Sequence, residues 1–218
     1  MKAEGGLEIA RVCRCRIVIK YRRSVTRIVA GRYGGRRLTA PDGRDTRPTS
    51  DRVREALFST LDSQMDLSGA RVLDLFAGSG AVGLEALSRG ASHALFVESD
   101  ARAAKAVRTN IEILSAAGAK IVTGRVVNVL GSGNLGEPYD LAFADPPYSL
   151  TEADLEAALT ALAGGGWLAP DAVVVIERSS RSPEPGWVPG VTGERGRRYG
   201  ETTLWYGRAA KNDGRLLP

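Results

Sequence analysis

Residues 145–148, "DPPY", place a carboxylate, two prolines and an aromatic ring directly after the mostly apolar residues 141–144. The apolar residues are typical of a buried strand, and the prolines, which cannot donate to a sheet ladder, would end it. Asp145 precedes a proline and is therefore biased towards an extended backbone. A strand followed by a Pro-rich turn is one interpretation and a catalytic loop is the other, so the rest of the chain has to decide between them.

Three glycines, Gly78, Gly80 and Gly83, follow another apolar segment in "VLDLFAGSGAVGLEAL" and are predicted to lie in the turn between a strand and its helix. Glycines in such a turn allow a ligand to approach the free N–H groups of the helix closely. Glu98 ends the next predicted strand, twenty residues after Gly78. A carboxylate there can accept hydrogen bonds from both hydroxyls of a ribose, which predicts an adenosine-containing ligand.

NAD and S-adenosylmethionine would use the same glycines and the same ribose-binding acid, and Asp74 distinguishes between these two ligands. A carboxylate at the end of the first strand would repel a pyrophosphate, but it can face the ammonium of an amino-acid group, directly or through water. The alternative is that Asp74 only caps the turn. The pattern favours S-adenosylmethionine over NAD, and hence a methyltransferase. The candidate cofactor-binding residues are Asp74, Phe76, Ala77, Gly78, Ser79, Gly80, Glu98, Ser99, Val126 and Asp145.

The candidate catalytic residues are Asp145, Pro146, Pro147 and Tyr148. In a doubly wound sheet, ligands lie beyond the carboxyl ends of the strands, so these residues should face the methyl group. The exocyclic amine of a nucleobase is a poor nucleophile because its lone pair is delocalised into the ring. If the Asp145 carboxylate and the Pro146 carbonyl accept its hydrogens, that lone pair becomes exposed. Tyr148 can stack on a base that has been flipped out of its helix or loop.

Strands alternate with helices from Arg71 onward, which predicts a parallel sheet covered on both faces. The expected fold class is α/β, a doubly wound, Rossmann-like class I methyltransferase fold with a mostly parallel seven-stranded sheet and an N-terminal β-hairpin. Strands are predicted at 71–76, 93–99, 119–124, 139–145 and 171–178, with a closing strand pair in 197–208. Helices are predicted at 81–90, 100–118, 126–130 and 152–163.

The expected organisation has four parts: a basic, poorly ordered extension at 1–25, a basic β-hairpin at 26–45, a methyltransferase domain at 46–208 and a flexible tail at 209–218. The hairpin is predicted from two short strands around "RYGGRR". The first helix of the domain has Thr49 or Ser50 as its N-cap and is expected to bury Val53, Leu57 and Leu61.

Positive charge is concentrated near the N-terminus. Residues 1–54 hold 15 Lys or Arg against 5 Asp or Glu, whereas residues 55–218 hold 15 against 20. This asymmetry indicates a segment that meets a polyanion, most often nucleic acid, although an arginine-rich, solvated surface is the alternative. The candidate RNA-binding residues are Arg32, Tyr33, Arg36, Arg37 and Arg47.

The chain has two cysteines, Cys13 and Cys15, and one histidine, His93. This set supports neither a disulfide framework nor a standard zinc site, and we expect no metal. No apolar run approaches the length of a membrane span, and the basic N-terminus lacks the apolar core of a signal peptide. We therefore expect a cytoplasmic protein.

The motifs "DLFAGSG" and "DPPY" together resemble the amino-group methyltransferases that act on nucleic acids. The fuller set, "RIVAGRYGGRRL", "RPTSDRVREALFSTL", "DLFAGSGAVGLEALSRGA", "FADPPY" and "RRYGETTLWY", resembles the RsmD family, the bacterial 16S rRNA (guanine(966)-N2)-methyltransferases, over about residues 26–207. The resemblance implies that Asp74, Gly78, Gly80 and Glu98 bind S-adenosylmethionine and that residues 145–148 form the catalytic loop. It also implies that the substrate is 16S rRNA within the 30S subunit or its assembly intermediate, and we expect a monomer.

Two features depart from the resemblance. In many such enzymes an acidic residue after the third strand meets the adenine amine, whereas this chain has Arg125 near that position. We therefore expect the backbone of Val126, or else Asn128, to contact the adenine. Residues 1–24 lie outside the resemblance and are either an RNA-binding extension or the product of an upstream start codon.

Other functions share part of this pattern. A DNA adenine-N6 or cytosine-N4 methyltransferase would usually carry a target-recognition insertion, and no segment here is long enough to supply one. Glutamine methyltransferases usually carry Asn before the two prolines. An NAD-dependent oxidoreductase is disfavoured by Asp74, and a non-catalytic RNA-binding factor is disfavoured by the intact "DPPY" loop.

Overall fold

The computed structural model describes residues 26–41 and 50–211. The strands are β1 (Arg71–Leu75), β2 (His93–Glu98), β3 (Ala119–Thr123), β4 (Tyr139–Ala144), β5 (Leu168–Ser179), β6 (Val191–Tyr199) and β7 (Thr202–Ala209). The helices are α1 (Asp51–Leu61), α2 (Ala81–Ser88), α3 (Ala101–Leu114), α4 (Val126–Gly131) and α5 (Glu152–Gly164). The predicted alternation of strands and helices is confirmed, while β5 and β6 begin earlier than predicted. The predicted extension at 1–25 lies outside the described residues, as does most of the predicted tail.

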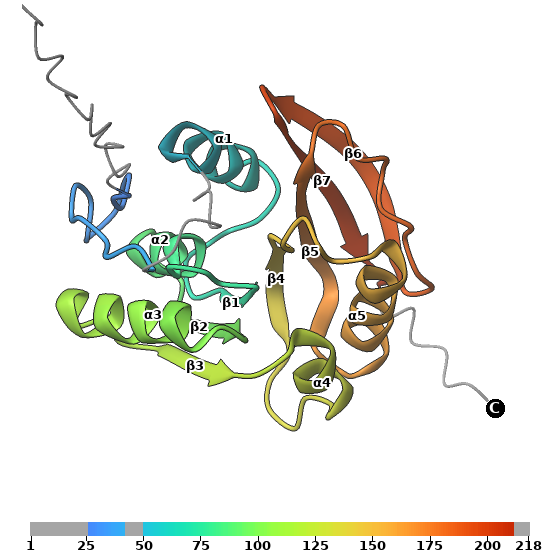
Figure 1. The fold of residues 1–218 in the computed structure, drawn as a ribbon, viewed down its shortest axis with the longest axis horizontal. Helices are drawn as coiled ribbons and strands as arrows, with labels where there is room; N and C mark the ends of the chain where they lie inside the picture. Colours follow the sequence, from blue (N-terminus) through green and yellow to red (C-terminus); the bar gives the residue numbers. More distant parts are fainter. Residues whose placement is uncertain (1–25, 42–49, 212–218) are drawn as a thin grey trace, which may run out of the picture.

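The strands form one seven-stranded sheet in the order β3-β2-β1-β4-β5-β7-β6 (Figure 1). Strands β1 to β5 pair in parallel, whereas β7 pairs antiparallel with both β5 and the edge strand β6. The fold class is therefore a doubly wound, Rossmann-like sheet, as predicted. Because β4 lies beside β1, with Leu75 opposite Ala144, the loops that follow these two strands meet at one edge of the sheet.

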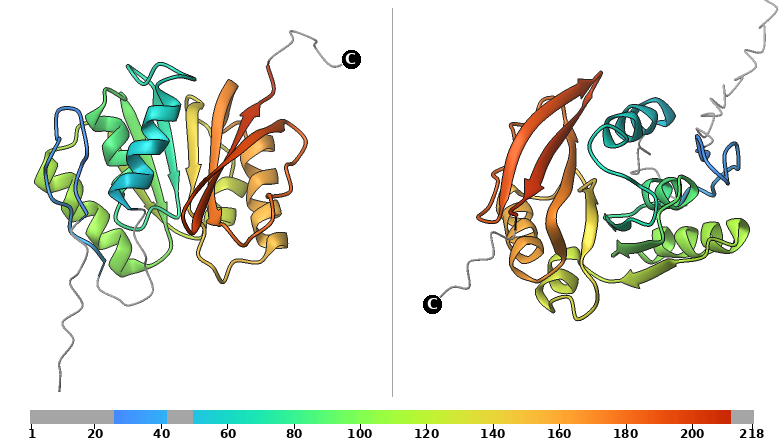
Figure 2. Two further views of the ribbon diagram at one scale, coloured as in Figure 1. Left: turned by 90° about the horizontal axis from the view of Figure 1, so that it is seen from above. Right: turned by 180° about the vertical axis from the view of Figure 1, so that it is seen from behind.

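Helices cover both faces of the sheet (Figure 2). One apolar cluster joins α1, α2 and α3 to one face, and a second joins α4 and α5 to the other. Along β1 the side chains alternate between them, since Val72 belongs to the first cluster and Leu73 to the second. Burial on both faces explains why the parallel strands read as nearly continuous apolar runs. In the part of the chain that the structure describes, no helix is long and apolar enough to span a membrane.

The α1 helix begins as predicted at Ser50, whose Oγ accepts a hydrogen bond from the N–H of Val53 at 3.3 Å. Such an N-cap satisfies one of the backbone donors that a helix leaves unpaired at its start. Val53, Leu57 and Leu61 are buried, as the four-residue spacing predicts. Thr49, the alternative N-cap, lies outside the described residues.

The segment 26–41 folds back on itself, but the two predicted strands reduce to a single antiparallel bridge between Arg27 and Arg37. The ladder stops because α2 takes the backbone donors that would have continued it. The N–H groups of Val29 and Ala30 donate to the Glu85 carboxylate at 2.6 and 2.9 Å. The first hairpin, as we name residues 26–41, is thus fastened to a helix rather than extended as a ribbon.

Candidate active site at the carboxyl ends of the strands

The loop between β1 and α2 holds three residues with left-handed backbone. Phe76, Gly78 and Gly80 have φ values of 58°, 57° and 75°. Gly80 is the N-cap of α2, and a Cβ on Gly78 would meet only the Phe76 carbonyl oxygen, at 4.0 Å, so the space over this backbone is open. A non-glycine residue at positive φ stores strain, and such strain gathers at binding sites. The loop therefore offers backbone that a ligand can approach closely.

Gly83 was predicted to lie in the turn, but the structure places it within α2. The helix begins at Ala81, as its predicted range gives, so only Gly78 and Gly80 belong to the turn. A Cβ on Gly83 would come within 2.4 Å of the Phe96 ring of β2. The third glycine is therefore needed for close packing of helix on strand.

The Asp74 side chain is buried, with 2% of its surface exposed. Its Oδ2 accepts a hydrogen bond from the N–H of Gly83 at 2.9 Å. Burial raises the pKa of Asp74 to about 7, opposed by this hydrogen bond and reinforced by the nearby Glu98 charge. Asp74 thus makes the capping contact that was the alternative interpretation, and it also lines the cavity described below.

Glu98 is held in place by the backbone on both sides. Its Oε2 accepts a hydrogen bond from the N–H of Gly78, and its Oε1 accepts one from the N–H of Asp100, each at 2.8 Å. Each carboxylate oxygen keeps a second lone pair with which it can accept a hydroxyl. The backbone therefore fixes the carboxylate next to the glycine loop, and its binding of a ribose stays a prediction.

Asn110 supports the glycine loop from behind and was not identified from the sequence. Its side chain is fully buried, and its Nδ2 donates to the carbonyls of Ser79 and Thr39 at 2.9 and 3.0 Å. Its Oδ1 accepts from the N–H of Thr39 at 2.7 Å. The available signal was a polar residue on the buried face of α3, three residues after Val107.

A cavity of about 480 Å³ opens at the carboxyl ends of β1, β2, β4 and β5. This volume lies within the range of small-molecule sites. The predicted residues among its lining are Asp74, Phe76, Ala77, Gly78, Ser79, Glu98, Ser99, Asp145, Pro146, Pro147 and Tyr148. An open glycine loop, an oriented acid and a buried acid in one cavity fit a cofactor with an adenosine part and a cationic amino-acid part.

The structure does not bring Val126 to this cavity. Val126 is buried in the second apolar cluster, because the first turn of α4 directs it into the core, and Asn128 is exposed on the same helix. Neither residue is among the lining of the cavity, and Gly80 is also absent from it. The side of the cavity next to Glu98 is formed instead by the start of α3, where Asp100, Arg102 and Ala103 line it.

The loop after β4 bounds the other side of the same cavity. The N–H of Asp145 donates to the Leu75 carbonyl at 3.4 Å, and the N–H of Leu150 donates to the Pro147 carbonyl at 2.9 Å, which closes the turn. Tyr148 is an aromatic residue with 76% of its surface exposed. An exposed ring on a turn stiffened by two prolines is a suitable platform for stacking.

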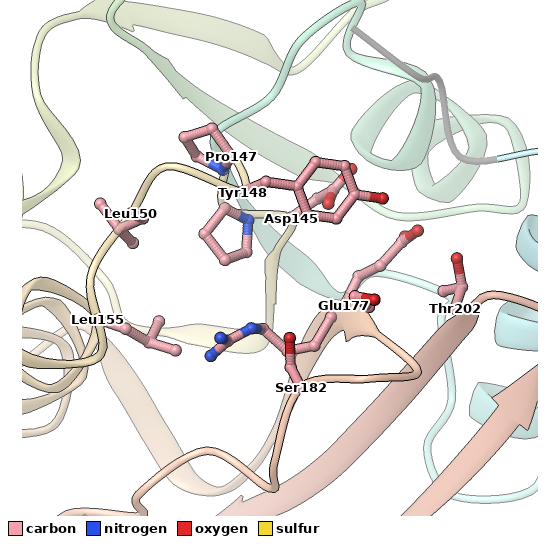
Figure 3. A pocket seen from close by; sticks show the side chains of 11 residues that line it. Asp145, Pro147, Tyr148, Leu150, Leu155, Glu177, Ser182 and Thr202 are labelled. Atoms are coloured by element: carbon pink, nitrogen blue, oxygen red, sulfur yellow. The ribbon is translucent and has the colours of Figure 1, made fainter. Parts of the chain in front are cut away.

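Four further residues complete this side of the cavity and were not identified from the sequence: Tyr199, Glu201, Thr202 and Glu177. Glu177, near the end of β5, is 8% exposed. Figure 3 shows the Glu177 side chain in the same pocket as the side chains of Asp145 and Tyr148, with Thr202 beyond it. A smaller cavity of about 50 Å³ under the loop is also lined by Asp145, Tyr148 and Glu177. The missed signal was an acid close to the end of a buried strand, the same pattern that identified Asp145.

The tip of the first hairpin lies away from this cavity. Arg32 donates to the Leu87 carbonyl at 3.2 Å, and Arg36 donates to the Ile113 carbonyl at 3.0 Å. These carbonyls lie in the last turns of α2 and α3, which end near the amino ends of the strands. Arg32 also lies 4.8 Å from the centre of the Tyr33 ring.

Arg32 and Arg36, two of the predicted RNA-binding residues, are therefore not gathered around the loop at residues 145–148. Arg37 is exposed, and Arg47 lies outside the described residues. Only the end of the first hairpin, at Ala40 and Pro41, reaches the lining of the cavity.

The sequence of the chain is similar to a family model and to several known proteins. The family described as conserved hypothetical protein 95 matches residues 26–208. The ribosomal RNA small subunit methyltransferase D of Escherichia coli K12 is 40% identical over 151 residues, which are 69% of this chain and 73% of that protein. The protein of the same name from Haemophilus influenzae is 35% identical over 159 residues, 72% of this chain and 80% of that protein.

Solved structures show the same fold. The structure of yhhF from Escherichia coli has a TM-score of 0.74 and 33% identity, and it covers 86% of this chain and 99% of its own. The magnesium protoporphyrin IX methyltransferase of Synechocystis, solved with bound S-adenosylmethionine, has a TM-score of 0.56 at 12% identity over 73% of this chain and 79% of its own. The second similarity concerns the fold alone. With this fold, this site and these relatives, the chain belongs to the RsmD family of S-adenosylmethionine-dependent methyltransferases.

Proposed function

We propose that this protein methylates the exocyclic N2 amine of a guanine in 16S ribosomal RNA of the small-subunit particle. The observation that carries the proposal is one cavity bounded by the glycine loop and Glu98 on one side and by residues 145–148 on the other. A cofactor held at Glu98 and a base held at Tyr148 would therefore share one enclosure. The names of the relatives from Escherichia coli and Haemophilus influenzae support ribosomal RNA as the substrate class.

The loop residues prepare the amine for transfer. S-adenosylmethionine supplies a methyl group on a positively charged sulfur. The Asp145 carboxylate and the Pro146 carbonyl accept the two amine hydrogens, which draws the nitrogen towards tetrahedral geometry and frees its lone pair. Tyr148 holds the flipped base by stacking, a contact worth about 1–3 kcal/mol on other aromatic platforms. No strong base has to act beforehand, because the amine becomes acidic as it gains the methyl group, and the proton that it then loses passes to the Asp145 carboxylate.

Glu177 supports guanine as the base. The β4–β5 register pairs Ala144 with Ile176, so Asp145 and Glu177 follow directly on neighbouring strands. The Watson–Crick edge of guanine presents N1–H beside the N2 amine, and a second carboxylate next to Asp145 can accept that hydrogen. Adenine presents an acceptor at N1 and would meet this carboxylate unfavourably. We further propose that the enzyme works as a monomer in the cytoplasm, where it meets the particle or its assembly intermediate.

Transfer of a tritiated methyl group tests the proposal. The acceptors are small-subunit particles from a strain that lacks the corresponding enzyme, naked 16S RNA and duplex DNA. Wild-type protein should label the particles, and Asp145→Ala should transfer at least about 100-fold more slowly even at saturating cofactor concentration. Asp145→Asn, which keeps one acceptor oxygen, should fall between them. Labelling of DNA instead of particles, or a wild-type rate in Asp145→Ala, would contradict the proposal.

A further inference from the structure

We propose that a row of side chains on β6, formed by Arg195, Arg197 and Tyr199, binds the RNA backbone and leads the substrate to the cavity. The inference deepens the proposed function and rests on it. The sequence predicts a closing strand pair in residues 197–208, and it places RNA binding on the first hairpin and Arg47 instead.

The pleat of the strand aligns the three residues. Alternate residues of a strand point to the same face, so Arg195, Arg197 and Tyr199 share one. Arg195 is opposite Tyr206 of β7, with its guanidinium 5.6 Å from the centre of that ring. Tyr206 belongs to the apolar cluster that joins α1 to the sheet. The row therefore runs along the α1 face of the edge strand.

The row ends at the active site. Tyr199 is the last residue of β6 and lines the cavity together with Glu201 of the following turn and Thr202, the first residue of β7. Figures 1 and 2 show β6 and β7 as a long ribbon at one end of the sheet, next to β5. A strand of RNA lying along Arg195 and Arg197 would thus reach Tyr199 and, across the cavity, Tyr148.

The two guanidinium groups are available for phosphates. Arg195 and Arg197 are exposed, and within residues 26–41 and 50–211 neither takes part in an ion pair or a hydrogen bond through its side chain. Other arginines of this region are already paired, since Arg208 contacts Glu194 at 2.8 Å and Arg178 binds Glu152. Each phosphate contact by an arginine releases counterions, so binding along this row would be sensitive to salt and insensitive to sequence.

The double variant Arg195→Ala/Arg197→Ala tests the inference. Lys105→Ala/Lys120→Ala is the matched control, because it removes two positive charges from exposed positions on α3 and β3, at the opposite edge of the sheet. The measurements are filter binding of 16S RNA against salt concentration, KM for the particles, and kcat. Cofactor affinity and thermal unfolding report on the integrity of each variant.

We expect the β6 variant to raise KM for the particles about tenfold or more, with kcat and cofactor affinity within about twofold of wild type. The slope of log K against log salt should fall by roughly 1.4–1.8, the value for two lost phosphate contacts. The Lys control should stay within about twofold in KM, and Arg195→Lys/Arg197→Lys should restore most of the binding. An unchanged slope and KM in the β6 variant, or equal losses in the Lys control, would overturn the inference. Failure of the wild type to methylate would refute the proposed function, whereas the RNA-binding slope is measured independently of transfer.

Discussion

Two arginine-rich hairpins lie at different places on the sheet, and they use their charges differently. The first hairpin has its tip near the amino ends of the strands, where Arg32 and Arg36 donate to carbonyls of α2 and α3. The second hairpin, β6–β7, ends at the cavity and leaves Arg195 and Arg197 exposed. Both hairpins are rich in arginine, yet only the second places exposed arginines on a strand that ends at the cavity.

The difference follows from what lies underneath each hairpin. Glu85 of α2 is fully buried and accepts hydrogen bonds from Val29, Ala30 and Arg89. Among the described residues, no buried acid binds the exposed arginine side chains of β6, whose backbone is already paired with β7. Positive charge near an anionic substrate therefore indicates binding only where the guanidinium is not already used within the fold.

Glu85→Ala should detach the first hairpin and cause the largest loss of stability. Removal of the buried carboxylate leaves two backbone N–H groups without their acceptor, and the Arg89 guanidinium keeps only Asp62, at 3.6 Å, as an acidic partner. We expect the free energy of unfolding, measured with urea, to fall by roughly 3–5 kcal/mol. The matched variant in the second hairpin is Glu194→Ala, which removes a surface partner of Arg208 and should cost about 0–1 kcal/mol. Equal losses in the two variants would contradict the contrast between the hairpins.

Asn110→Ala should show that the first hairpin supports the glycine loop. The substitution removes the partner of the Ser79 and Thr39 carbonyls, at roughly 1–3 kcal/mol for each buried group left unsatisfied. We expect lower stability in urea together with weaker cofactor binding by calorimetry. Thr109→Ala, at the preceding position of the same helix, serves as the control and should leave cofactor affinity unchanged. If Asn110→Ala bound the cofactor with wild-type affinity, the first hairpin would have no role in supporting the cofactor site.

Glu177→Gln should show whether the β5–β7 side of the cavity recognises the base. In 2-aminopurine the amine remains but N1 is an acceptor, so the wild-type carboxylate should disfavour it, while the amide of Gln can donate to it. We expect the preference for guanine over 2-aminopurine at the methylated position to fall about tenfold or more, in single-turnover transfer to reassembled particles. Glu152→Gln, which alters the carboxylate that pairs with Arg178, is the control and should keep the preference. An unchanged preference in Glu177→Gln would exclude N1 recognition by this residue.

Asp74 gives the smallest effect, a dependence of cofactor affinity on pH. Its pKa of about 7 is raised above the unfolded value, so the protonated form contributes stability at low pH that is lost as pH rises through 7. A cofactor ammonium facing Asp74 favours the ionised form. Affinity for S-adenosylmethionine should therefore fall as pH drops below 7, by at most tenfold per pH unit. Asp74→Asn should bind more weakly and with a flatter pH profile, whereas the same slope in both proteins would assign the titration to another group.

Much of the fold could be predicted from the sequence, because periodicity and caps report on local structure. The alternation after Arg71, the Ser50 cap and the buried positions of α1 were all visible in that way. The position of the first hairpin in the chain was predicted correctly, but its strand pairing was not. Its ladder is interrupted by Glu85, which lies 55 residues along the chain from Ala30, and no local pattern shows such a contact.

The candidate site could be predicted in part for the same reason. Residues that end strands, such as Asp74, Glu98 and Asp145, are grouped by the rule that parallel strands end at one edge. Asn110 was missed because it acts through tertiary contacts, whereas Glu177 was missed although it lies close to the end of a buried strand. Val126 was placed at the cofactor from its position after β3, but the turn of α4 buries it in the core.

The identity of the methylated nucleoside decides whether the proposed chemistry is right. Small-subunit particles from a strain without the corresponding enzyme would be methylated with labelled cofactor, and their RNA digested to nucleosides for mass spectrometry. We predict N2-methylguanosine at one position, absent with Asp145→Ala. N6-methyladenosine, or label in protein with none in RNA, would contradict the proposed function.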